Sequence, residues 1–123
     1  MLKGLDVSNA RMIVNETARD LTVTLCIQQG GDRGQLHGTV KFSLKPGESR
    51  SIAYGDVRNC LLSGVVIRSE TEGKCIVRTG LVKKSGDTLD VWLNNGLQVT
   101  IDNTRMTMLT VGYPDESQLY RYI

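Results

Sequence analysis

The sequence predicts an all-β protein, an antiparallel β-sandwich of about nine or ten short strands. Apolar residues alternate with polar ones along most of the chain, which is the period of a strand with one buried face. Turn signals rich in Gly, Pro and Asn recur about every 8–12 residues, the spacing typical of a sandwich or barrel. No stretch keeps the i, i+3, i+4, i+7 apolar pattern long enough for an amphipathic helix.

Length and composition indicate one domain over residues 1–123. The chain is 40% hydrophobic and 23% charged, as in globular proteins. We expect two packed sheets with immunoglobulin-like or jelly-roll-like connectivity, and a partly closed barrel is the alternative topology. Residues 113–123 are expected to form an aromatic-rich C-terminal strand or arm.

The first half of the chain predicts four strands. Alternation marks residues 11–14 and 21–28, and a further pair at 40–45 and 52–54 flanks Pro46-Gly47. Because Pro-Gly is a strong turn signal, we expect these last two strands to form a hairpin around residues 45–48.

The middle of the chain is more continuously apolar. Residues 61–67 predict a strand in which Ser63-Gly64 marks a bulge or a close backbone approach. One short helical turn is allowed over residues 55–63. Turns are expected at 71–74 and 85–87, with a strand from residue 75 between them.

The last third gives the clearest strand pattern. Leu89, Val91 and Leu93 alternate with polar residues, and Asn94-Asn95-Gly96 is the strongest hairpin signal in the chain. Residues 97–101 form the expected return strand, and residues 105–111 follow as another after a turn. In this register Trp92 lies on the polar phase, so we expect it on the outer face.

Charge and residue usage exclude several classes of function. Fifteen Lys and Arg against thirteen Asp and Glu leave a net charge of +2 without clustering, so we expect no nucleic-acid partner. No apolar stretch approaches a membrane span, and the N-terminus lacks a secretory signal, so we expect a cytoplasmic protein without membrane contact. Cys26, Cys60 and Cys75 are expected to be free core or sheet-facing thiols, and with one His we expect no metal and no cofactor.

Three regions supply candidate binding residues. The glycine-rich loop 29–38 contains Asp32, Arg33 and His37, and it is either a ligand-contacting loop or a plain connection. An exposed Trp92 would offer a large contact area for a partner or a sugar ring. The tail adds a third group of candidates, which are Tyr113, Tyr120 and Tyr122. It either pairs with the sheet edge of its own chain or reaches a neighbouring subunit.

These observations favour a non-enzymatic module, because no catalytic constellation, metal set or cofactor motif is visible in the sequence. We expect a protein-binding or assembly module that self-associates or binds another protein. The alternative is a sandwich that binds a small molecule or carbohydrate near Trp92 and loop 29–38.

Overall fold

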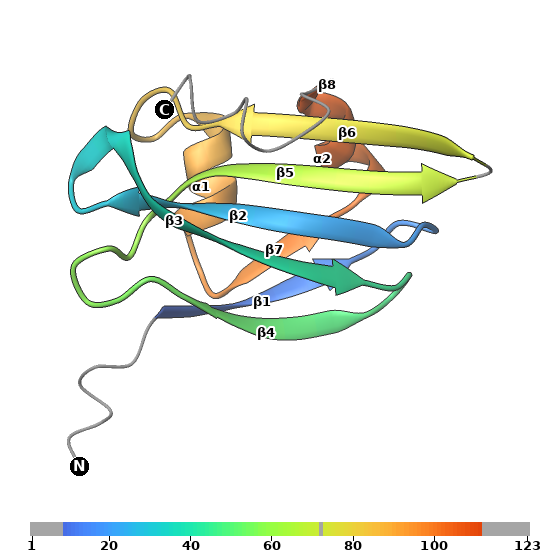
Figure 1. Cartoon of the computed structure of the whole chain (residues 1–123), viewed down its shortest axis with the longest axis horizontal. Helices are drawn as coiled ribbons and strands as arrows, with labels where there is room; N and C mark the ends of the chain where they lie inside the picture. The colour runs from blue at the N-terminus through green and yellow to red at the C-terminus, as the bar shows by residue number, and fades with distance from the viewer. Residues whose placement is uncertain (1–8, 72, 112–123) are drawn as a thin grey trace, which may run out of the picture.

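The computed structural model describes residues 9–71 and 73–111, and the chain is mostly β (Figure 1). It has seven strands of four residues or more, the two-residue β8, and two short helices. In chain order these are β1 (Asn9–Asn15), β2 (Leu21–Gln29), β3 (Asp32–Leu44), β4 (Ser49–Tyr54), β5 (Leu62–Thr71), β6 (Lys74–Leu81), α1 (Thr88–Asn94), β7 (Gln98–Ile101), α2 (Asn103–Met108) and β8 (Thr110–Val111).

The strands form two open sheets. Sheet A has the order β4-β1-β7, and sheet B has the order β3-β2-β5-β6-β8. All pairings are antiparallel except β1 with β7, which is parallel. The all-β prediction is therefore confirmed, whereas nine or ten strands, a wholly antiparallel arrangement and a partly closed barrel are wrong for the part of the chain described.

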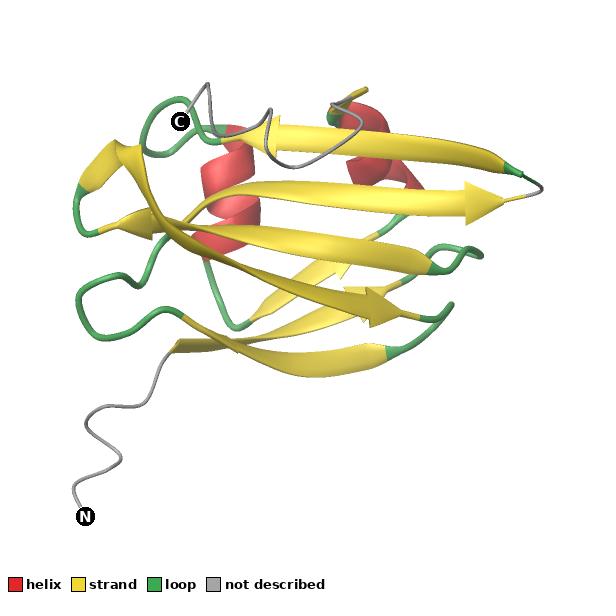
Figure 2. Ribbon diagram, viewed as in Figure 1, coloured by secondary structure: helices red, strands yellow, loops and turns green. Residues whose placement is uncertain are grey.

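One hydrophobic core lies between the inner sides of the two sheets and the helices. Leu21, Val23 and Leu25 of β2 meet Ile13 of β1 and Leu93 of α1 in this core. Their alternation in β2 is the pattern that predicted a strand. In Figure 2, α1 lies behind sheet B, on the same side as sheet A.

The turn at residues 45–48 is present, but it does not close the predicted hairpin. The Glu48 amide donates to the Lys45 carbonyl at 2.9 Å, and Gly47 has a φ of 77°. The chain nevertheless changes sheets at this turn, since β3 pairs with β2 and β4 pairs with β1. The turn residues therefore predict where the chain reverses, but they do not predict which strand pairs with which.

Two predicted strands are helices. Residues 89–93 lie in α1, where Leu89, Trp92 and Leu93 share the buried face. The helix starts because the Asp87 carboxylate accepts a hydrogen bond from the Asp90 amide at 2.8 Å, which is an N-cap. Asp102 caps α2 in the same way, and α2 replaces most of the predicted strand 105–111. These two replacements account for the smaller number of strands.

Gly64 confirms the close backbone approach expected at Ser63-Gly64. A Cβ there would lie 2.8 Å from the Gly80 carbonyl oxygen of the neighbouring strand β6. The β2–β5 register also shifts beside it, between Cys26 and Ile27. The helical turn allowed over residues 55–63 does not form, because residues 55–61 are a loop.

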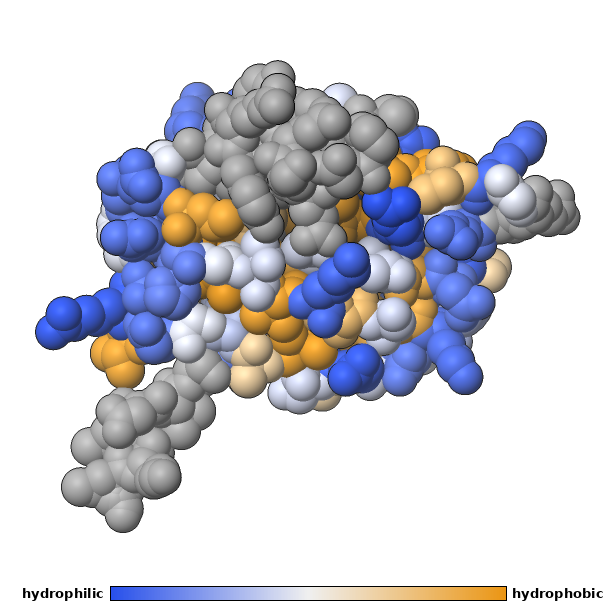
Figure 3. All heavy atoms as spheres, viewed as in Figure 1, coloured by the Kyte–Doolittle hydropathy of each residue, from blue (hydrophilic) through white to orange (hydrophobic). Residues whose placement is uncertain are grey.

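On the face viewed in Figure 3, most hydrophilic residues gather at the two ends, and less polar residues occupy much of the described surface between them. The middle of the sheet is therefore the less polar part of this face.

Candidate functional site

The loop of residues 55–61, between β4 and β5, is held in one conformation by its own polar groups. Gly55 opens it with a φ of 64°, and a Cβ at this position would overlap the Asn59 carbonyl oxygen. Only glycine fits such a position, because the backbone is left-handed and another backbone segment packs against it.

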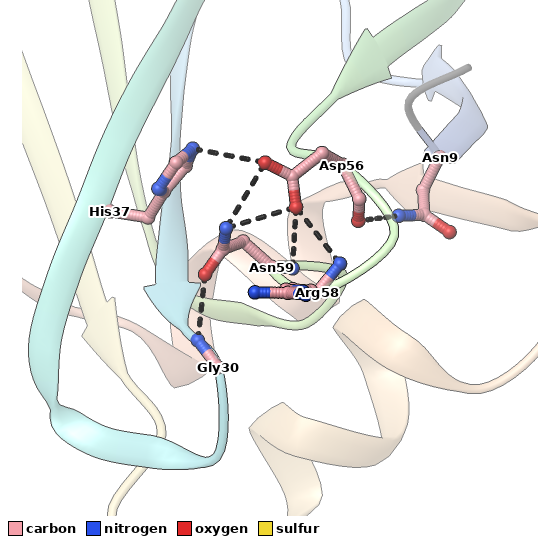
Figure 4. Close-up of polar contacts among 6 residues, drawn as sticks. All are labelled: Asn9, Gly30, His37, Asp56, Arg58 and Asn59. Atoms are coloured by element: carbon pink, nitrogen blue, oxygen red, sulfur yellow. Dashed lines mark hydrogen bonds and ion pairs between the residues drawn. The ribbon is translucent and has the colours of Figure 1, made fainter. Parts of the chain in front are cut away.

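The Asp56 carboxylate organises this loop (Figure 4). Its Oδ1 accepts hydrogen bonds from the amides of Arg58 and Asn59 and from the Asn59 side chain, each at 2.9 Å. The Asn59 Oδ1 in turn accepts from the Gly30 amide at 2.8 Å. The loop is thereby joined to the turn between β2 and β3, at one end of the molecule.

His37 of β3 approaches the same carboxylate without forming a hydrogen bond to it. Its Nε2 lies 3.9 Å from the Asp56 Oδ2, and both side chains are partly exposed. Hydrogen bonds from Asn59 and Arg58 lower the pKa of Asp56, so the carboxylate is charged near neutral pH. Three of these hydrogen bonds reach the Asp56 Oδ1, so the carboxylate stabilises the conformation of the loop.

The other sequence candidates do not gather around His37. The exposed Asp32 accepts a hydrogen bond from the Gly34 amide at 3.0 Å, which is a local turn contact. Arg33 lies in β3, and its side chain falls outside the described part of the structure. Loop 29–38 is itself mostly strand, because the chain reverses at Gly30-Gly31 and β3 begins at Asp32.

Trp92 is buried, so its predicted position on the outer face is wrong. Its side chain is 8% exposed, and its indole Nε1 donates to the Thr100 carbonyl at 3.0 Å. The Arg105 guanidinium lies 6.0 Å from the ring centroid. Trp92 therefore joins α1 to β7 and α2 and offers no platform to a partner. The remaining three candidates, Tyr113, Tyr120 and Tyr122, lie outside the described residues.

A pocket of about 350 Å³ lies between α1, the end of β2 and the loop before β5. The buried Gln28 lines it together with Asp90 and Asn94 of α1, and the exposed Leu61 and Val91 add apolar surface. The Asp90 carboxylate accepts from the Asn94 side chain and the Gly86 amide, both at 2.7 Å. These two hydrogen bonds fix the orientation of the Asp90 side chain.

Sheet A presents an outer face without charged residues. Its inner positions, such as Ile13, Ile52 and Val99, are buried in the core, so the alternate positions point outward. Strand pairing places these outward side chains in three rows: Ser51, Met12 and Gln98; Ser49, Val14 and Thr100; and Ala53 with Ala10. We call these eight positions the outer face of sheet A, and most of them are exposed.

Sites of other kinds have little support within residues 9–71 and 73–111. No group of three His, Cys, Asp or Glu side chains is arranged to hold a metal ion there. Neither described helix has the length and apolarity to cross a membrane. None of the three cysteines forms a disulfide bond. Cys26 is buried, as expected for a core or sheet-facing thiol, whereas Cys75 is exposed.

The chain matches no family model, no curated protein and no solved structure. Sequence reasoning missed Asp56 and Asn59, although Gly55-Asp56 followed by Asn59 has the residue types of a side-chain-stabilised turn. It also missed the outer face of sheet A, because strand pairing, rather than sequence order, brings its rows together.

Proposed function

We propose that this protein is a non-enzymatic assembly module that self-associates through the outer face of sheet A. In this proposal the two sheets are the layers of a β-sandwich, a view supported by the main core that both sheets share. The observation that carries the proposal is the absence of charge from all eight side chains of that face.

The composition of the face suits contact with an identical face. Seven of its side chains are Ala, Ser, Thr, Val or Gln, and they present little relief, so two sheets can approach closely. Met12, in the central strand, is 38% exposed and supplies a flexible apolar contact at the middle of the patch. A two-fold pairing of the patch with itself would cover it in both copies.

The size of the face indicates a weak dimer. With strands about 4.8 Å apart and a rise of roughly 3.3 Å per residue, three strands as long as β1 cover about 330 Å² per partner. A dimer would then bury about 660 Å² in total, below the roughly 1,200 Å² of stable specific interfaces. We therefore expect association that depends on concentration, with a Kd of roughly 10–1,000 μM.

Sedimentation velocity across this concentration range tests the proposal. The native chain is expected to shift from monomer toward dimer as concentration rises. In Ser51→Arg, two guanidinium groups would enter the uncharged interface, and we expect at least about a tenfold loss of affinity.

Ser43→Arg is the matched control, because Ser43 is likewise an exposed serine on a strand but belongs to β3 of sheet B. It should self-associate like the native chain. Equal weakening by both substitutions, or a native chain that stays monomeric at the highest concentration, would remove the support for this interface.

A second candidate function is binding of a small polar ligand in the pocket beside α1. Its volume of about 350 Å³ lies within the usual range for ligand pockets. Among the described residues Asp90 has no cationic partner, so a small amine suits the site better than an anion. Titration with n-butylamine should shift the amide signals of Gly86 and Asn94 in an NMR spectrum, and n-butanol, the uncharged control, should not. Equal effects of both probes would argue against the role of Asp90.

A further inference from the structure

The outer face of sheet B contains a second buried hydrophobic cluster, separate from the main core. It consists of Cys26 of β2, Val66 of β5 and Val77 of β6, with Leu36 and Leu81 packed against it. Strand pairing places Cys26 and Val66 out of phase with Leu25 and Val65, which face the main core. The cluster therefore lies on the side of sheet B that points away from sheet A.

The side chains of this cluster are buried so deeply that another segment must lie over them. Cys26 is 0% exposed, Val66 is 6% and Val77 is 8%. Met12, which also lies on the outward side of a central strand, is 38% exposed. Both described helices contribute to the main core on the opposite side, so none of the described elements lies over the cluster.

Thr79 gives a second, independent indication of a partner on this face. It lies opposite Val66 in the β5–β6 pairing and therefore shares the outward phase. It is 7% exposed, and its Oγ1 forms no hydrogen bond with the described residues. A buried hydroxyl group without a partner is unfavourable, so a polar group from outside the described residues would stabilise Thr79.

The chain leaves the described structure beside this face. β8 pairs with β6, Thr110 lies opposite Thr79, and Val111 is the last described residue. The twelve residues that follow can span roughly 40 Å when extended, whereas β6 and β2 lie only about 10 Å apart across the sheet. Residues 1–8 are less suitable, because β1 begins in sheet A.

The composition of residues 112–123 fits an apolar stripe bordered by cations. Leu119, Tyr120, Tyr122 and Ile123 supply apolar and aromatic side chains. Lys41 and Arg68 lie in the outward phase of β3 and β5, since Lys41 is opposite Thr24 and Thr24 is opposite Val66. Asp115 and Glu116 of the segment have the complementary charge.

We propose that residues 112–123 dock onto the outer face of sheet B in the same molecule and cover the cluster of Cys26, Val66 and Val77. The segment buries this apolar face and presents a hydrogen-bonding group to the Thr79 hydroxyl. Sheet B then has no free apolar face, and sheet A keeps the exposed uncharged one.

Thiol reactivity of Cys26 tests the proposal in a Cys60→Ser, Cys75→Ser background. In the chain of residues 1–123 with these two substitutions, Cys26 should react slowly with Ellman's reagent, at a rate that does not change with protein concentration. A chain that ends at Val111 should react at least about tenfold faster while its circular dichroism stays unchanged, because the thiol becomes accessible. Deletion of residues 1–8 is the matched control and should leave Cys26 protected.

Three outcomes would overturn the proposal: equal rates in the folded long and shortened chains, loss of protection on removal of residues 1–8, or protection that disappears on dilution. The last would indicate a cover from a second copy. Should the shortened chain fail to fold, nuclear Overhauser contacts in the unmodified chain decide the matter. We expect contacts between the methyl groups of Val66 and Val77 and protons of residues 112–123, and their absence from an assigned spectrum would contradict the docking.

Discussion

At the scale of single residues, Gly55 is the position where the loop geometry is most demanding. Gly55→Ala should destabilise the fold strongly, because the backbone is left-handed there and the added Cβ would overlap the Asn59 carbonyl oxygen. Gly47→Ala is the matched control, with a similar positive φ and open space around its Cβ. We expect the control to cost about 1–2 kcal/mol and Gly55→Ala at least about twice as much in denaturant unfolding. Equal losses would show that the contact with Asn59 contributes nothing.

Tyr54 is the residue that should give the fold an alkaline pH dependence. Burial raises the pKa of its phenol, and the Arg11 guanidinium, which donates to the hydroxyl at 3.0 Å, offsets part of this rise. Stability from the neutral phenol is present below the ordinary pKa of about 10 and is lost as the pH rises through the higher folded value. In an absorbance titration of tyrosinate, Tyr54→Phe should remove the step at highest pH. Removal of an earlier step would contradict this assignment.

At neutral and acid pH, Asp56 is the residue that should make the stability of the fold depend on pH. Hydrogen bonds from Asn59 and Arg58 lower the pKa of this carboxyl. Its stabilising effect is therefore present above the ordinary Asp pKa of about 4 and is lost as the pH falls through the lower folded value. Asp56→Asn should reduce the melting temperature more at pH 7 than at the lowest pH at which the native chain stays folded, because protonation of the native carboxyl removes its charge as the pH falls. A pH-independent difference would indicate that charge is not what stabilises the loop.

At the scale of elements, the two helix caps differ in what they support. Asp87 starts α1, which buries Leu89, Trp92 and Leu93, whereas Asp102 starts α2, which has no fully buried residue. Asp87 also accepts hydrogen bonds from the amides of Lys83 and Lys84. Asp87→Ala should therefore cost about 1–2 kcal/mol in thermal or chemical unfolding, and Asp102→Ala about 0.5–1 kcal/mol. The reverse order would mean that α1 contributes less to the core than its burial indicates.

Helix α1 shows why an apolar pattern alone does not always distinguish a helix from a strand. The alternation of Leu89, Val91 and Leu93 fits a strand, and Leu89, Trp92 and Leu93 fit one side of a short helix equally well. The Asp87 cap and the buried contact of Trp92 favour the helix over a strand. Of these two features, only the cap is visible in the sequence. By contrast, β2 has four apolar positions in strict alternation, and its strand prediction is confirmed.

The candidate site was less predictable than the strands. His37 was named from its loop, but its neighbours Asp56 and Asn59 come from a segment about twenty residues away, which the β2–β3–β4 connectivity brings to the same end. The chain reverses tightly at Gly30-Gly31, so most of the predicted loop 29–38 belongs to the long strand β3. Sequence gives residue types and turns, whereas the partner of each strand depends on contacts across the whole fold.

At the scale of the whole molecule, the outer faces of the two sheets differ in how deeply their apolar side chains are buried. Sheet B buries Cys26 and Val66 on its outer face, and sheet A leaves Met12 exposed among uncharged side chains. Under the two proposals, residues 112–123 complete sheet B within one molecule and a second copy covers sheet A. The proposals are separable, because a chain that ends at Val111 should retain the self-association of sheet A while losing the protection of Cys26.

The most direct test of self-association through sheet A is an NMR dilution series of the unmodified chain. Between roughly 1 mM and 10 μM, the signals of Ala10, Met12, Ser51 and Gln98 should move together along one binding curve, because their environment changes as the weak dimer dissociates. Signals of β3 and β6 in sheet B should stay in place. Shifts confined to sheet B, or a spectrum that does not change across the whole series, would contradict an interface on the outer face of sheet A.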